Sequence, residues 1–67
     1  MNKRILRRKQ IQDKTGLSRS TLYQLIKEER FPRQIRLGKR MVGWIEAEID
    51  SWIADRMADR DLRKLDP

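Results

Sequence analysis

The 67-residue chain contains neither cysteine nor histidine, and this absence narrows the ways in which so short a chain can be held together. Disulfide bonds and zinc sites built from Cys or His are excluded, as is nucleophilic catalysis by a Cys–His or Ser–His pair. A chain of this length buries only about 60% of its unfolded surface, so its stability depends on a few large apolar side chains. We therefore expect one small domain over residues 1–60 that binds no cofactor or metal and is not an enzyme.

Charge is distributed unevenly along the chain. Residues 1–40 contain 13 Lys and Arg against three Asp and Glu, whereas residues 41–67 contain four against seven. The two parts carry formal charges of +10 and −3, which together give the net charge of +7. A surface polarised in this way is suited to a polyanion such as a nucleic acid. The alternative is that the basic side chains only solvate the surface.

Gly and Pro residues divide the chain into short segments. Residues 8–15 are predicted to form a helix that ends before Gly16, because Gly adopts the left-handed conformation without steric cost. A second helix is predicted over residues 18–29. Ser18 is a strong N-cap, apolar residues follow at helical spacing, and Phe31-Pro32 stops the helix.

The second half of the chain predicts a β-hairpin followed by a helix. Apolar and polar residues alternate on both sides of the turn 38–40, with the apolar positions at Ile35, Leu37, Val42 and Trp44. A helix is expected from about residue 46 to residue 60, with a core-facing stripe formed by Ile45, Ile49, Trp52, Ile53 and Met57. Residues 61–67 are a charged tail that is expected to fray, and residues 4–7 are a short strand or an ordered arm.

The order helix, tight turn, helix is the helix-turn-helix pattern. The apolar positions that pack its two helices together are occupied, around Gly16, by Ile11, Leu17, Leu22 and Leu25. Gln12 departs from the general pattern, because the position four before the Gly usually holds Ala. With the hairpin as a wing, the predicted fold class is mainly α with a small antiparallel β-hairpin: a winged helix-turn-helix with three helices.

The polar face of helix 18–29 is the predicted recognition surface, because the first turns of such a helix meet base edges in the major groove. Arg19 can pair with guanine O6 and N7, and Gln24 with adenine N6 and N7. Ser20 and Thr21 are expected to contact phosphates, whereas Ser18 is first the helix cap. Tyr23 is expected to contact a thymine methyl group or a phosphate. The predicted DNA-binding residues of this helix are Ser18, Arg19, Ser20, Thr21, Tyr23, Gln24 and Lys27. The alternative is an ordinary solvated helix face.

Basic residues also mark the predicted wing. Lys39 and Arg40 at the hairpin tip are expected to reach a phosphate or a narrow minor groove. Arg36 completes the predicted DNA-binding set, and Arg33 raises the local positive potential. The alternative is a charged turn that keeps a sheet edge soluble.

Several segments of the chain, taken together, point to a known family. They are Thr15–Ile26 (TGLSRSTLYQLI), Phe31-Pro32-Arg33, Arg36-Leu37-Gly38, Val42-Gly43-Trp44 and Glu48–Ile53. In this combination the chain resembles the AlpA family of prophage regulatory proteins over about residues 5–56. The resemblance implies an excisionase-like winged helix fold related to the DNA-binding domain of MerR-type regulators. It also implies a role in phage or integrated-element biology, as an activator of integrase or excision genes or as an excisionase.

The leading hypothesis is a sequence-specific DNA-binding transcriptional regulator of prophage or integrated-element genes. Helix 18–29 would lie in the major groove and the wing 38–40 on the backbone or in the minor groove. The alternative on the same fold is an excisionase-type factor that bends DNA and sets the direction of recombination. The expected partner is double-stranded DNA, with an integrase or RNA polymerase as candidate protein partners; the oligomeric state stays open.

Two hypotheses of other classes are weaker. An RNA-binding protein would present exposed aromatic rings, whereas Trp44 and Trp52 fall in apolar patterns and are assigned to the core. A partner-binding module would carry an apolar tail, and Leu62 and Leu65 form only a faint stripe. No run approaches the roughly 20 apolar residues of a membrane span, so we expect a cytoplasmic protein with no membrane partner.

Overall fold

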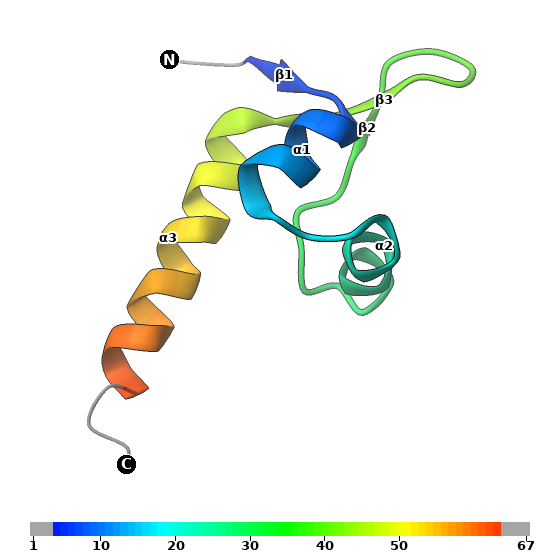
Figure 1. Ribbon diagram of the computed structural model, residues 1–67. Helices are drawn as coiled ribbons and strands as arrows, with labels where there is room; N and C mark the ends of the chain where they lie inside the picture. Colours follow the sequence, from blue (N-terminus) through cyan, green and yellow to red (C-terminus); the bar gives the residue numbers. More distant parts are fainter. Residues whose placement is uncertain (1–3, 64–67) are drawn as a thin grey trace.

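The computed structural model describes residues 4–63, which form three helices and a small sheet (Figure 1). The strands are β1 (Ile5–Leu6), β2 (Ile35–Arg36) and β3 (Val42–Ile45), and the helices are α1 (Arg8–Thr15), α2 (Arg19–Lys27) and α3 (Glu46–Arg63). The predicted fold class, mainly α with a small antiparallel hairpin, is confirmed. Of the helices in this part of the chain, none combines the length and apolar composition needed to span a bilayer.

Strand β3 lies at the centre of the sheet, between β1 and β2, and both neighbours pair with it antiparallel. Ile35 is opposite Gly43 in the predicted hairpin. Leu6 is opposite Trp44, so the segment whose structure the sequence left open is a short strand. Since β1 joins the sheet, the residues that follow it are held beside the wing at the start of α1.

One apolar core joins all three helices to the sheet. Its buried members are Leu6, Ile11, Leu22, Phe31, Trp44 and Ile49. Trp44 is fully buried, as predicted, and its indole N–H donates to the Pro32 carbonyl at 3.1 Å. Trp52 is half-buried and packs against this core with its ring edge-to-face on Phe31, at 4.7 Å between centroids. Both indoles therefore serve packing: the N–H of Trp44 has a hydrogen-bond acceptor, and the ring of Trp52 has an aromatic neighbour.

The turn between α1 and α2 has the predicted conformation. Gly16 has φ = 75° and its N–H donates to the Gln12 carbonyl at 2.7 Å, which ends α1. Ile11 of α1 and Leu22 of α2 are both fully buried in the shared core. The predicted helix-turn-helix is therefore present, with its exposed face determined by the burial of Leu22.

Helix α2 ends earlier than predicted. The expected end was residue 29, but the helix stops at Lys27, and Glu29 adopts φ = 59°. The N–H of Glu29 donates to Ile26 at 3.0 Å and the N–H of Arg30 to Leu25 at 2.8 Å, the two hydrogen bonds of a Schellman motif. The sequence did not reveal this stop because a Glu, rather than a Gly, occupies the left-handed position.

Helix α3 starts at the predicted residue and runs further than expected. It continues to Arg63, so residues 61–63 of the predicted tail are helical, while residues 64–67 lie outside the described residues. Its second half extends beyond the rest of the molecule (Figure 1). For this reason Met57 is 51% exposed, and its predicted place in the core is wrong.

Lys14 links α1 to α3. Its ammonium group lies 2.8 Å from Asp50 Oδ1 and 3.4 Å from Glu46 Oε2. The hydrogen bond with Asp50, helped by the charge of Glu46, raises the pKa of Lys14 above its usual 10.5. Because folding raises the pKa of Lys14, its ion pairs contribute their full stabilisation at pH values below 10.5. That stabilisation is lost as the pH rises through the pKa that Lys14 has in the folded protein.

Candidate nucleic-acid interface

The first turn of α2 is organised by its cap. The backbone N–H of Thr21 donates to Ser18 Oγ at 3.2 Å, and the Ser18 hydroxyl donates to Thr21 Oγ1 at 2.9 Å. Ser18 is therefore the N-cap that the sequence predicted. Because the two hydroxyl groups are hydrogen-bonded to each other, their first role is to cap the N-terminus of α2.

The polar face of α2 is open to solvent. Arg19, Ser20, Gln24 and Lys27 are exposed, on the side opposite buried Leu22. Within the described residues no ion pair involves Arg19 or Lys27. Gln24 is different, because its amide N–H donates to Glu28 Oε2 at 2.8 Å. This amide must leave Glu28 before it can pair with a base.

The wing lies on the same side of the molecule as α2 (Figure 1). Lys39 and Arg40 at its tip are exposed. Arg36 is exposed too, but its guanidinium donates to the wing itself, to the carbonyls of Gly38 and Lys39, at 3.3 Å each. Its geometry is that of a residue that shapes the wing.

A hollow of about 630 Å³ separates α2 from the wing. It is lined from the helix side by Ile26 and Lys27 and from the wing side by Arg33, Gln34, Arg36, Lys39 and Val42. Arg33 also pairs with Glu29, at 3.6 Å. No carboxylate lines this hollow, so the cations of α2 and of the wing share one concave surface that suits an anion.

Sequence reasoning missed a second basic hollow, of about 340 Å³. It is lined by Arg7, Arg8, Lys9, Tyr23, Arg40 and Val42. Tyr23, which the sequence analysis assigned to the recognition face, is half-buried and lines this hollow. The basic run 7–9 was visible in the sequence, but only the packing of α1 against the wing brings it next to Arg40.

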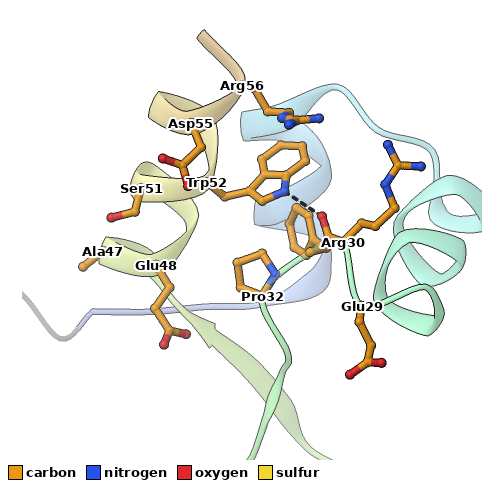
Figure 2. Close-up of a pocket in the computed structure, with 10 residues that line it drawn as sticks. Glu29, Arg30, Pro32, Ala47, Glu48, Ser51, Trp52, Asp55 and Arg56 are labelled. Atoms are coloured by element: carbon orange, nitrogen blue, oxygen red, sulfur yellow. Dashed lines mark hydrogen bonds between the residues drawn. The ribbon is translucent and has the colours of Figure 1, made fainter. Parts of the chain in front are cut away.

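A third hollow, of about 670 Å³, lies between α3 and the segment that follows α2 (Figure 2). The indole of Trp52 crosses it and donates to the Arg30 carbonyl at 2.8 Å (Figure 2). Glu29, Glu48 and Asp55 contribute carboxylates to its lining. Arg30 and Arg56 also line it, so carboxylates outnumber guanidinium groups there and the hollow lacks the excess positive charge of the other two.

The fold and the exposed basic surface define the class of protein: a winged helix-turn-helix, with a polar helix face beside a basic wing. The chain belongs to the AlpA family. The family model described as "Prophage CP4-57 regulatory protein (AlpA)" matches residues 4–57. This is a family of regulatory proteins and not of enzymes.

Two relatives of known sequence are similar to this chain. The chain is 42% identical over 59 residues to a protein of Escherichia coli K12 named "DNA-binding transcriptional activator AlpA", covering 79% of this chain and 84% of the relative. It is 44% identical over 57 residues to "Uncharacterized protein ORF88" of Enterobacteria phage P4, covering 85% of this chain. The match spans 65% of the phage protein's length.

Proposed function

We propose that this protein is a sequence-specific DNA-binding transcriptional regulator of prophage or integrated-element genes. The observation that carries the proposal is the exposed polar face of α2 beside a basic wing, with no carboxylate in the hollow between them. The relative from Escherichia coli named a DNA-binding transcriptional activator supports the same function. Such a regulator acts in the compartment that holds the DNA, which we take to be the cytoplasm.

In this proposal α2 enters the major groove and the wing follows the backbone or the minor groove. Arg19, at the start of the helix, would pair with a guanine, and Gln24 with an adenine after leaving Glu28. The Ser20 and Thr21 hydroxyls would contact phosphates. Lys27, Lys39 and Arg40 would supply the sequence-independent attraction that determines the salt dependence of binding.

Selection of bound fragments from a random duplex DNA pool, at near-physiological salt and with single-stranded RNA as competitor, tests this function. Enrichment of a defined motif that resists the RNA is the expected result. Binding without enrichment, or binding abolished by RNA, would contradict sequence-specific recognition of duplex DNA.

Arg19→Ala tests the role of the recognition helix. We expect it to relax the preference at one base pair of the selected motif and to weaken binding by about 1–3 kcal/mol. The measurement is the affinity for the selected duplex and for duplexes altered at each position. Arg56→Ala, which removes the same charge from α3, is the control and should leave both quantities unchanged. An equal loss on every duplex would show that Arg19 contacts phosphate alone.

An excisionase-type function on the same fold predicts different behaviour, because a bending factor kinks its DNA and binds several adjacent sites. Electrophoretic mobility of complexes with the site at different positions along one fragment distinguishes the two. Unchanged mobility supports the regulator, with RNA polymerase as the protein partner to test first. Position-dependent mobility supports the bending factor, with an integrase as that partner.

A further inference from the structure

The second basic hollow brings together residues from three parts of the chain. Arg7, Arg8 and Lys9 come from the start of α1, Tyr23 from α2 and Arg40 from the wing. Tyr23 also precedes Ile26 by about one helical turn, and Val42 lines both basic hollows. The two hollows therefore follow one another along the junction of α2 with the wing, where a nucleic-acid backbone would pass.

The charge of this hollow is uncompensated. Four cations and no carboxylate line it. Among the described residues, no ion pair involves Arg7, Arg8, Lys9 or Arg40. Other cations of the same chain do have acidic partners: Lys14 contacts Asp50, and Arg30 contacts Glu28. Cations gathered without counter-charge repel one another, and an anion in the hollow would relieve that repulsion.

Gln12 holds one of these cations in place. Arg8 Nη1 donates to Gln12 Oε1 at 2.6 Å, and Gln12 Nε2 donates to the Leu17 carbonyl at 3.3 Å. The amide thus connects the helix-turn-helix turn to the guanidinium of Arg8, which is half-buried. This contact gives a function to the residue that departs from the usual Ala of the helix-turn-helix pattern. Arg8 is ordered before any ligand arrives, which reduces the entropy lost on binding.

We propose that this hollow is a clamp for a backbone phosphate of duplex DNA, with Gln12 as its positioning residue. The guanidinium groups of Arg8 and Arg40 and the Tyr23 hydroxyl would donate to the phosphate oxygens, since arginine forks match phosphate geometry. Tyr23 thereby contacts a phosphate and not a thymine methyl group. The proposal rests on the proposed function for the choice of duplex DNA as ligand, but it does not require sequence preference.

The salt dependence of binding tests the clamp. The probe is a 30-base-pair duplex of scrambled sequence, and the affinity is measured by fluorescence anisotropy from 50 to 300 mM KCl. Loss of one phosphate contact should flatten the slope of log K against log salt by about 0.9. We expect that change for Arg8→Ala, with affinity about tenfold lower at 150 mM salt. Arg56→Ala removes the same charge elsewhere and should leave the slope unchanged.

A double-mutant cycle tests the role of Gln12. If Gln12 acts through Arg8, Gln12→Ala should weaken binding by roughly threefold in the wild-type background and have no effect in the Arg8→Ala background. The Ala variant carries the residue usual at this position, and thermal unfolding checks that it folds. Gln12→Glu is a second variant: its carboxylate would pair with Arg8 and should flatten the salt slope as Arg8→Ala does.

Each outcome distinguishes the clamp from the wider function. An unchanged slope for Arg8→Ala, or an equal effect of Gln12→Ala in both backgrounds, overturns the clamp even if the protein prefers a selected motif. A flattened slope on scrambled DNA supports the clamp even if no motif is enriched, in which case only sequence recognition fails. If the wild-type protein binds no duplex, the clamp is overturned together with the proposed function.

Discussion

The backbone of Glu29 is in a conformation that a side chain resists. With φ = 59° it occupies the left-handed region, where a residue with a Cβ is strained by roughly 1 kcal/mol. We expect Glu29→Gly to raise the free energy of unfolding by about 0.5–1 kcal/mol, because the Schellman hydrogen bonds remain and the strain disappears. The lost contact with Arg33, at 3.6 Å between exposed groups, contributes little. Urea unfolding measures the change.

Glu28 provides the matched control for this prediction. It is the preceding residue and has φ = −83°, which any residue adopts without strain. Glu28→Gly should therefore lower the free energy of unfolding, since it adds freedom to the unfolded chain and removes the exposed contacts of Glu28 with Gln24 and Arg30. Equal changes in the two variants would show that charge, and not backbone conformation, determines stability at this end of α2.

Gly43, in the central strand, is constrained by lack of space for a side chain and not by its backbone conformation. A Cβ at this position would overlap Ile5 Cγ2 and lie 3.1 Å from Leu37 Cδ1. Gly43→Ala is expected to lower the free energy of unfolding by about 1–3 kcal/mol, measured by thermal unfolding. Gly38→Ala is the control, because its Cβ would meet only Met41 Cβ, at 3.9 Å. Tolerance of Gly43→Ala at the level of Gly38→Ala would mean that β1 moves aside at no cost.

Among the elements, the wing is held by its own backbone and by one side chain. Leu37 N–H donates to the Met41 carbonyl at 2.7 Å, and Arg36 holds the carbonyls of the turn. Arg36→Lys keeps the charge but loses the planar fork that reaches both carbonyls. We expect residues 38–40 to become more mobile in the free protein, with backbone NMR order parameters falling below about 0.6. DNA affinity should fall by a few-fold, because a loose wing must be ordered on binding.

Lys39→Met is the control for the wing. It removes a charge at the tip but none of the hydrogen bonds that Arg36 makes, because its backbone carbonyl stays. Order parameters of the turn should therefore match those of the wild-type protein. If Arg36→Lys also leaves them unchanged, the guanidinium does not hold the turn, and its role as a direct DNA contact regains support.

The elements also differ in how far sequence could predict them. The end of α1 at Gly16 and the cap at Ser18 depend on single residues with strong local preferences, and both are confirmed. The end of α2 was placed wrongly because Glu29 has no such preference and is held by its neighbours. The exposure of Met57 depends on whether another element lies opposite α3, which periodicity does not reveal.

In the candidate interface, too, some features could be predicted from the sequence and others depend on how the elements pack. The exposure of Arg19 and Lys27 follows from the helical spacing of the buried residues, and the basic wing tip follows from the turn. The approach of Arg8 to Tyr23 and Arg40 depends on how α1 packs beside the wing. Gln12 was visible as a departure from the pattern, but its two hydrogen bonds required the turn in three dimensions.

At the scale of the whole molecule, charge is separated in space as well as in sequence. The two basic hollows lie along α2 and the wing, whereas Glu48 and Asp55 lie in the hollow beside α3. In Figure 1, α3 is on the other side of α1 from α2. A molecule polarised in this way approaches a polyanion in a preferred orientation, so its net charge alone does not describe its binding.

Two charge reversals that change the net charge by the same amount test this polarity. Lys39→Glu on the wing and Arg56→Glu on α3 each lower the net charge from +7 to +5. At about 0.15 M salt the screening length is near 8 Å, so only charges close to the DNA contribute. We expect Lys39→Glu to weaken duplex binding by about tenfold or more and Arg56→Glu by less than about twofold, measured by fluorescence anisotropy. At about 0.01 M salt, screening extends to about 30 Å and the gap between the variants should narrow. Equal losses at the higher salt would mean that binding follows the net charge, and the polarised interface would be wrong.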